Sequence, residues 1–178
     1  SEWLYIEGYL VSTDKARLAA IEARMLAETH QVKTALSLSD PNMVRFFEEG
    51  LKAMIGEKVN LLFANEEEAM LFTRSDSLEE ACERLRSVAD AFAVTLGSKG
   101  AVIYDGTDYI NVAASTVTAV DTNGAGDLFA GAMLYGLTHQ LGYQKSAQLA
   151  SYASGLLVTE FGPRLSESGL NAVKEYLK

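Results

Sequence analysis

The chain has 178 residues, 48% of them hydrophobic, and a formal net charge of −9 at pH 7, which together predict a single acidic domain with a substantial core. An acidic surface argues against nucleic acid or an anionic membrane as the main partner, but it leaves room for a phosphate ligand held by backbone N–H groups. Cys82 as the single cysteine excludes a disulfide framework, and the lack of a long apolar run or a signal peptide favours a cytoplasmic enzyme or binding domain.

The N-terminal half alternates strands and helices. The first expected strand covers residues 3–10. Because this strand begins almost at the first residue, and that residue is not an initiator Met, we expect the chain to be the C-terminal part of a longer protein. An amphipathic helix capped by Thr13 follows, with an apolar stripe made of Leu18, Ile21 and Met25. The alternation then continues with strands at 33–39, 59–65 and 91–97 and helices at 43–55, 66–73 and 77–89, the last capped by Ser77 with Glu80 in the capping-box position.

The C-terminal half begins with strands and ends in helices. Strands are expected at 100–106, 108–114 and 115–121, and helices at 124–137, at 143–162 and from Ser168. Strands that alternate with helices imply a mainly parallel sheet, and ligands bind such sheets beyond the C-terminal ends of the strands. The segments LLFANEEE, AVTLGSKG and TAVDTNGAGD are each expected at such an end.

The sequence DTNGAGD at residues 121–127 precedes an apolar helix. Gly124 and Gly126 carry no side chain, so a ligand can approach their N–H groups closely, and the helix start favours negative charge. These features predict an anion hole, with Asp127 beside it as an acceptor for the proton of an attacking hydroxyl. The plainer alternative is a glycine-rich turn in which Asp127 only stabilises the helix end. A dinucleotide loop fits less well, because GAGDLFAG lacks the G-x-G-x-x-G spacing.

The segment AVDTNGAGDLFAGAMLYGL resembles the C-terminal signature of the ribokinase (PfkB) superfamily of ATP-dependent sugar and nucleoside kinases. The motifs NEEE, VTLGSKGAVIYDG and ASYASGLLVTEFGPRL follow the same family pattern, so the resemblance covers the whole chain, and YIEGYL, LSLSDP and FGPRL lean toward its adenosine-kinase-like branch. It implies a three-layer, Rossmann-like α/β fold with helices on both faces of the sheet, of which residues 1–178 are the C-terminal part. The family's N-terminal lid and its glycine-rich acceptor motif have no counterpart here.

The resemblance also implies roles for the residues of the DTNGAGD motif. Asp127 corresponds to the catalytic base, and the N–H groups of Gly124, Ala125 and Gly126 correspond to the anion hole for the transferring phosphoryl group. A side chain at Gly126 is expected to obstruct that group and to strain the turn. Asp121 lies in the region where some family members bind a monovalent cation such as K⁺.

Two other segments carry both a functional and a structural interpretation. Asn65 and Glu68 match the family's N-x-x-E motif, which organises Mg²⁺ and water around the ATP phosphates. Glu68 is expected to act on the metal through water. The alternative is structural, because the same spacing is that of a helix capping box. Thr95, Gly97 and Gly100 correspond to contacts with the phosphates or ribose of the nucleotide, or form a simple turn.

A stretch of small residues gives a last candidate. Ala150, Ala153 and Gly155 form either a wall for adenine or a site of close helix packing. His139 and Cys82 receive no role.

Two hypotheses of different classes follow. The favoured one is the C-terminal part of a kinase that moves the γ-phosphoryl group of MgATP to a primary hydroxyl of a nucleoside or sugar. This hypothesis is compatible with a homo-oligomer. The alternative is a nucleotide-binding fragment without catalytic activity of its own. The intact Asp127 favours the first hypothesis, and the missing N-terminal half favours the second.

Overall fold

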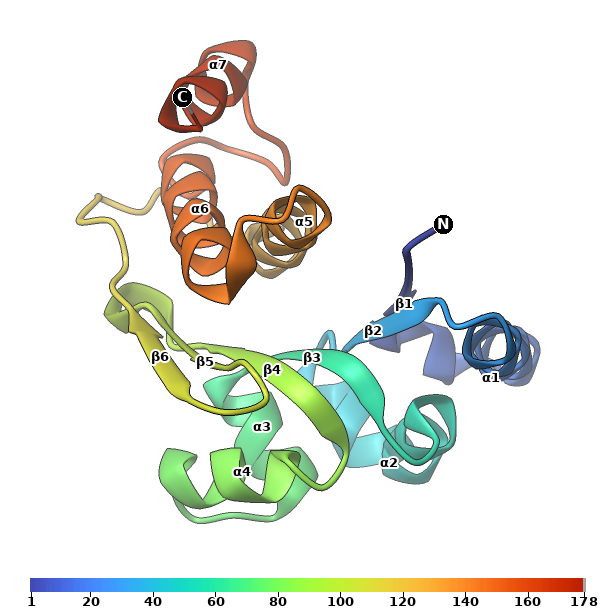
Figure 1. Cartoon of the computed structure of the whole chain (residues 1–178). Coiled ribbons are helices and arrows are strands. Elements are labelled where there is room, and N and C mark those ends of the chain that lie inside the picture. The colour runs from blue at the N-terminus through green and yellow to red at the C-terminus, as the bar shows by residue number, and fades with distance from the viewer. Residues whose placement is uncertain (178) are drawn as a thin grey trace. The chain divides into compact units, whose positions relative to one another are not determined.

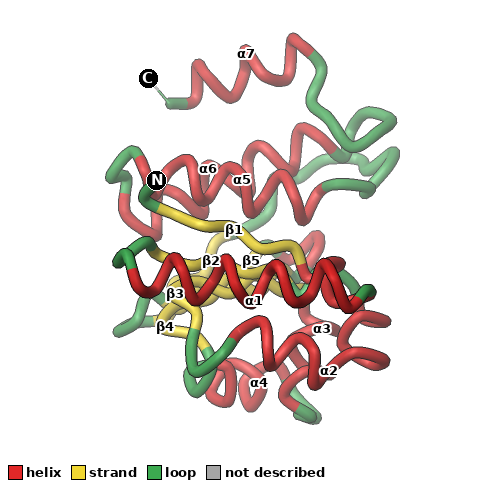
Figure 2. Tube along the Cα trace, turned by 90° about the vertical axis from the view of Figure 1, so that its right-hand side faces the viewer, coloured by secondary structure: helices red, strands yellow, loops and turns green. Residues whose placement is uncertain are grey.

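Figures 1 and 2 show the computed structural model of the chain, which describes residues 1–177. Six strands form one sheet in the order β1-β2-β3-β4-β5-β6. They are β1 (Trp3–Glu7), β2 (Lys33–Ser37), β3 (Val59–Asn65), β4 (Ala89–Thr95), β5 (Ala101–Tyr104) and β6 (Tyr109–Val112). The chain separates into two compact units, one formed by Ser1–Val94 with Tyr104–Thr107 and the other by Thr95–Ile103 with the residues from Asp108 onward.

The first unit is built from βαβ crossovers. Helix α1 (Asp14–Thr29) connects β1 to β2, and helix α2 (Pro41–Ile55) connects β2 to β3. Both strand pairs are parallel, with Tyr5 opposite Ala35 and Ala35 opposite Leu61. Helices α3 (Glu66–Thr73) and α4 (Leu78–Leu85) then lead to β4, and α2, α3 and α4 lie on one face of the strands of this unit (Figure 1). The predicted α/β class is confirmed.

Local hydrogen bonds explain why these helices begin where they do. The Thr13 hydroxyl accepts from the Ala16 N–H at 3.4 Å, and the Asp40 carboxylate accepts from the Asn42 N–H at 2.7 Å. The Ser77 hydroxyl accepts from the Glu80 N–H at 3.2 Å, as predicted. The return contact differs from a capping box, because the Glu80 carboxylate accepts from the N–H of Asp76 at 3.2 Å.

Three expectations about the first unit are corrected. Strand β1 ends at Glu7, and a 3₁₀ helix (Gly8–Ser12) follows, because the Gly8 N–H donates to the Ser39 hydroxyl at 2.8 Å. The predicted apolar stripe of α1 does not face the core: Leu18 is 63% exposed and Met25 is 55% exposed, whereas small residues of this helix, Ala20 and Ala27, are buried. The helix α4 ends at Leu85, four residues before the predicted end at 89.

The core of the first unit lies between the sheet and its helices. Strand β3 is buried along most of its length, with Leu61 and Leu62 fully buried, as expected for a strand that is apolar on both faces. From the helices, Leu51, Met54 and Leu85 are also fully buried.

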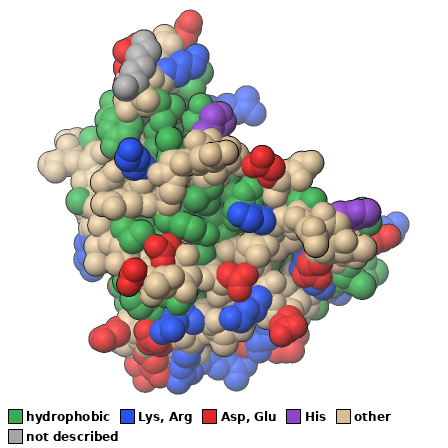
Figure 3. Space-filling view, viewed as in Figure 1, with side chains coloured by type: hydrophobic (Ala, Val, Ile, Leu, Met, Phe, Trp, Pro, Cys, Tyr) green, Lys and Arg blue, Asp and Glu red, His purple; other side chains and the backbone are tan. Residues whose placement is uncertain are grey.

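Acidic and basic side chains lie intermixed on the face shown in Figure 3. In the first unit, the Glu48 carboxylate lies 2.7 Å from the Lys52 ammonium and 2.9 Å from the Arg74 guanidinium. These hydrogen bonds, first that to Lys52 and then that to Arg74, lower the pKa of Glu48. Among residues 1–177, no helix is both long and apolar enough to cross a bilayer.

The second unit contains a 3₁₀ turn (Gly97–Lys99), strands β5 and β6, and helices α5 (Ala125–Thr138), α6 (Gly142–Leu157) and α7 (Glu167–Tyr176). Helices α5 and α6 pack closely, since a Cβ at Gly136 would lie 2.4 Å from the Ser146 hydroxyl. Figure 2 shows the two helices side by side.

Two boundaries in this unit differ from the predictions. The strand expected at 115–121 is absent, because this segment has no ladder partner and Val117 and Val120 are 42% and 50% exposed. It is held instead by the Val120 N–H, which donates to the Val158 carbonyl at 2.7 Å. Helix α6 ends at Leu157 rather than at 162, and the loop that follows has Gly162 at a φ of +97°.

Candidate functional site

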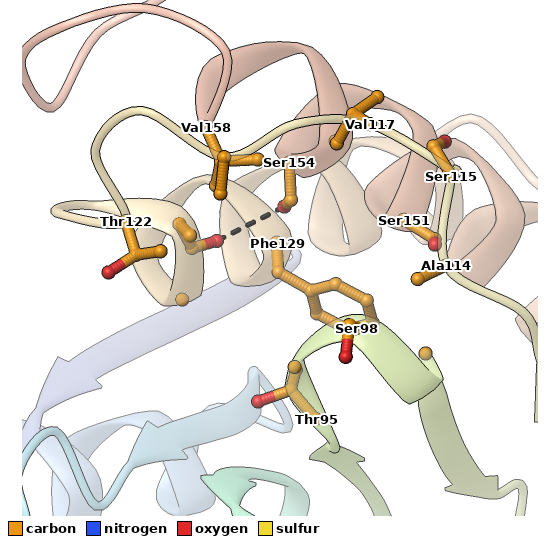
Figure 4. A pocket seen from close by; sticks show the side chains of 16 residues that line it. Thr95, Ser98, Ala114, Ser115, Val117, Thr122, Phe129, Ser151, Ser154 and Val158 are labelled. Atoms are coloured by element: carbon orange, nitrogen blue, oxygen red, sulfur yellow. Dashed lines mark hydrogen bonds between the residues drawn. The ribbon is translucent and has the colours of Figure 1, made fainter.

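The second unit contains a cavity of about 250 Å³ (Figure 4). Residues from four places surround it: the turn after β4, the segment 114–122, the start of α5 and one face of α6. Six residues of the sequence prediction line it, namely Thr95, Gly97, Gly100, Ala125, Gly126 and Gly155. Others were missed, among them Ser98, Ser115, Phe129, Ser151 and Ser154. The structure therefore brings the turn after β4 and the GAG segment together around one space.

The N-terminus of α5 closes one end of this cavity. Gly124 precedes the helix in a left-handed conformation with a φ of 76°, and no side chain caps the helix. The Ala125 N–H donates to the Thr122 carbonyl at 3.2 Å, so one of the three N–H groups assigned to the anion hole already has a partner. Uncapped N–H groups at a helix start are suited to bind an anion.

The two glycines of the motif have different structural roles. A Cβ at Gly124 would lie 2.7 Å from the Pro163 Cβ, so a side chain at this left-handed position would be strained and crowded. A Cβ at Gly126 would have nothing within 4 Å, and its φ is not positive. The expectation that a side chain at Gly126 strains the turn is therefore wrong: the strain belongs to Gly124, and position 126 opens onto free space.

Asp127 is in the first turn of α5, one residue beyond Gly126. Its side chain is exposed, and it does not line the cavity. The helix start gives this carboxylate a favourable electrostatic position. The arrangement places an exposed acid directly after Ala125 and Gly126, two of the three residues of α5 that line the cavity. The Asp127 carboxylate is therefore accessible from solvent.

The turn after β4 depends on glycine for its backbone conformation and also lines the cavity. Gly97 and Gly100 have φ values of 59° and 102°, and a Cβ at Gly100 would lie 1.9 Å from the Val112 carbonyl oxygen. The backbone turn therefore requires glycine at position 100. The same turn lines the cavity through Thr95, Gly97, Ser98 and Gly100. Contacts of these residues with a nucleotide remain a prediction.

Helix α6 forms the opposite wall of the cavity. Ser151, Ser154 and Gly155 line it, and a Cβ at Gly155 would lie 2.7 Å from the Ser115 Cβ. Position 155 is thus a site of close packing as well as part of the wall. Ala153 is only 1% exposed and is not among the residues that line the cavity, which places it in the packed core of the helix pair. Its predicted contact with adenine remains untested.

Asp121 connects the motif to the loop after α6. Its carboxylate accepts from the N–H groups of Asn123 and Gly162, each at 3.0 Å. These two hydrogen bonds lower the pKa of Asp121, with the bond from Asn123 having the larger effect. A carboxylate held ionised in this way suits a cation chemically, although its two oxygens already have these structural partners. The role of Asp121 toward a monovalent cation therefore remains a prediction.

Asn65 and Glu68 lie in the first unit, where β3 ends and α3 begins. They form a complete capping box: the Asn65 side chain accepts from the Glu68 N–H at 2.8 Å, and the Glu68 carboxylate accepts from the Asn65 N–H at 2.9 Å. The Asn65 side-chain amide also donates to Glu68 at 2.6 Å. Burial raises the pKa of Glu68 to about 7, while the hydrogen bond from the Asn65 backbone opposes this shift.

The described residues do not form a metal site made of protein side chains alone. Among residues 1–177, no three His, Cys, Asp or Glu side chains gather closely enough to hold a metal ion. Asp40 and Glu67 add negative charge near Glu68 and push its pKa further upward. A hydrated cation would relieve this repulsion, and Mg²⁺ usually keeps several of its waters. A role of Asn65 and Glu68 in organising Mg²⁺ through water remains a prediction.

Comparison with known proteins agrees with this geometry. A sequence model described as pfkB family carbohydrate kinase matches residues 1–168. The chain is 37% identical to a ribokinase of Lactococcus lactis over 120 residues, which are 67% of this chain and 39% of that protein. In solved structures, it is 34% identical to an adenosine kinase from Sinorhizobium meliloti, with a TM-score of 0.92 over 99% of this chain and 54% of the other.

A second solved structure gives the same result. A probable sugar kinase from Rhizobium etli is 34% identical, with a TM-score of 0.91 over 98% of this chain and 54% of the other. The chain spans about half the length, or less, of the proteins it matches.

Proposed function

Since the chain belongs to the pfkB family of carbohydrate kinases, we propose that it carries the donor site and the base of an ATP-dependent phosphotransferase. The acceptor would be a primary hydroxyl of a nucleoside or a sugar. The observation that supports this proposal most directly is the cavity that ends at the uncapped N-terminus of α5, with Asp127 in the same helical turn.

The phosphates of the donor would bind at the start of α5. The N–H groups of Gly124 and Gly126 would donate to the oxygens of the transferring phosphoryl group, whose negative charge the helix start favours. The lack of a side chain within 4 Å of the Gly126 Cβ position leaves space for this group. Phosphoryl transfer depends mainly on positioning and charge neutralisation, so this arrangement can supply much of the catalysis.

Asp127 would accept the proton of the acceptor hydroxyl. Its exposed carboxylate is accessible to an acceptor that binds outside the cavity, and an ordinary carboxylate suffices because the hydroxyl becomes acidic as its bond to phosphorus forms. Mg²⁺, held by the phosphates and through water by Glu68, would neutralise phosphate charge when bound.

The similar proteins suggest two kinds of acceptor. One is a ribokinase and another is an adenosine kinase, and the latter resembles this chain over almost its whole length. We propose a nucleoside such as adenosine as the first acceptor to test and ribose as the second. A nucleotide-binding role without catalysis is the second candidate, because the chain covers only 39% of the ribokinase and 54% of the adenosine kinase.

A coupled ADP-release assay distinguishes these candidates. The purified chain and a version extended to the length of its relatives are each given MgATP with adenosine, with ribose or with no acceptor. We expect acceptor-dependent ADP release from the extended protein that falls at least ~100-fold in Asp127→Asn, the usual lower range for removal of a general base. A protein that binds nucleotide but releases no ADP in any version would favour the second candidate.

A further inference from the structure

The loop that follows α6, residues 158–166, is attached to the DTNGAGD segment. The Gly162 N–H donates to the Asp121 carboxylate at 3.0 Å. Pro163 packs against the turn before α5, since a Cβ at Gly124 would lie 2.9 Å from the Pro163 Cα. Both contacts fall within the segment that leads into α5, so the loop is held beside the start of this helix.

Arg164 follows directly after Pro163 in this loop. Consecutive Cα atoms are about 3.8 Å apart, so the Arg164 Cα lies within about 7 Å of the position of a Gly124 Cβ. A side chain as long as that of arginine spans such a distance. Arg164 is also exposed, so a ligand at the start of α5 can draw its guanidinium toward itself without disturbing a packed core.

Arg164 differs from the other arginines in its partners. The chain has 24 acidic and 15 basic residues, so acidic partners are abundant. Among residues 1–177, every other arginine forms an ion pair with an acidic side chain, whereas Arg164 forms none. The paired arginines are Arg17, Arg24, Arg45, Arg74, Arg84 and Arg86. Glu160, an acid of the same loop, instead accepts from the Ser166 hydroxyl at 2.9 Å. The Arg164 guanidinium is therefore available to an anionic ligand.

We infer that Arg164 binds the γ-phosphoryl group of the donor and stabilises its charge during transfer. This inference rests on the proposed function, in which that group lies at the start of α5. A guanidinium donates two parallel hydrogen bonds to phosphate oxygens and adds a positive charge, which the backbone N–H groups cannot supply. Positive charge at this point favours the transition state, in which negative charge spreads over the oxygens of the transferring group.

Arg164 takes no part in the bond exchange itself. The oxygen of the acceptor hydroxyl forms a bond to the γ-phosphorus, the bond from that phosphorus to the oxygen of ADP breaks, and the hydroxyl proton passes to Asp127. ADP lacks the γ-phosphoryl group, so the contact with Arg164 strengthens the binding of ATP and not that of ADP.

Lys145 provides a matched control. It is an exposed basic residue in the first turn of α6, and the loop that carries Arg164 follows the other end of the same helix. At 1.5 Å per residue, Lys145 lies about 18 Å along the helix axis from Leu157. Removing its charge changes the net charge of the protein by the same amount, but far from the start of the loop.

The test uses the extended protein of the coupled assay, with Arg164→Ala, Arg164→Lys and Lys145→Ala as variants. Each is titrated with MgATP and with ADP, and kcat is measured with the acceptor that supports ADP release. We expect Arg164→Ala to weaken ATP binding at least ~10-fold, as for loss of charged hydrogen bonds, with ADP binding unchanged. Its kcat should fall at least ~100-fold. Arg164→Lys should lie between, because lysine keeps the charge but not the planar fork. Lys145→Ala should match the unaltered protein.

Thermal unfolding of each variant checks that the fold is unchanged, as expected for exposed side chains. A fall in kcat without a change in ATP affinity supports a contact made only in the transition state. Normal ATP affinity and kcat in Arg164→Ala would overturn the inference and leave the proposed function in place. Equal losses of ATP and ADP affinity, or equal losses of kcat in Lys145→Ala, would also overturn it. An unaltered protein that binds no ATP and releases no ADP would overturn both the inference and the proposed function.

Discussion

Glu68 gives the protein a pH-dependent stability that can be measured without its substrates. The side chain is only 5% exposed, and burial raises its pKa from the ordinary value of 4.5 to about 7. Between these two pH values the native state holds a proton that the unfolded state releases. The free energy of unfolding therefore falls as the pH rises through this window, and below it the cost of the buried charge disappears.

The size of the effect follows from the two pKa values. At 1.36 kcal/mol per pKa unit, the difference between 4.5 and about 7 corresponds to about 3 kcal/mol of lost stability. Glu68→Gln removes this titration, because a glutamine side chain stays neutral. The variant also weakens the capping box, since the Gln amide cannot accept from both Asn65 donors, at a cost of ~1 kcal/mol that does not depend on pH.

Urea unfolding at a series of pH values between 4 and 8 separates the two effects. The difference in unfolding free energy between Glu68→Gln and the unaltered chain should move by ~3 kcal/mol in favour of the variant from the acidic to the basic end. The control is Glu79→Gln, which replaces an exposed acid in the first turn of α4 and is carried through the same pH series. Parallel stability profiles for the Glu68 variant and the unaltered chain would refute the reasoning.

Four further predictions address the candidate kinase site. In the extended protein, Asp127→Asn should lower kcat at least ~100-fold with little change in nucleotide affinity, and near-normal turnover would contradict its role as base. Gly126→Val should abolish turnover while circular dichroism stays unchanged, because its side chain enters open space where the phosphoryl group would bind. Gly124→Ala should lower stability by about 1–3 kcal/mol in thermal unfolding, since its φ is +76° and its Cβ would crowd Pro163. Residues 1–178 alone should show no measurable transfer to adenosine or ribose, because nothing holds the hydroxyl beside Asp127; acceptor-dependent ADP release at ordinary enzyme rates would contradict this.

The sequence by itself determined the elements whose signals are local. Strand β3 and helix α3 have the predicted bounds, because an apolar run ends at Asn65, whose side chain and that of Glu68 cap the helix within four residues. The caps at Thr13 and Ser77 were predicted for the same reason. The glycine-rich start of α5 could also be read directly, since a helix terminus with no capping side chain depends on residues adjacent in the chain.

Tertiary structure decided the features that depend on distant partners. Strand β1 ends at Glu7, and the next N–H, that of Gly8, donates to Ser39, thirty-one residues away. The segment 115–121 is no strand because it has no neighbouring strand to pair with. Packing against the rest of the unit decides which face of α1 is buried. The stripe of larger apolar residues therefore predicted the wrong face. Ser151 and Ser154 were missed because a serine gives no sign of its hydrogen-bond partner: their bonds to the Ala113 and Ala125 carbonyls depend on how α6 packs.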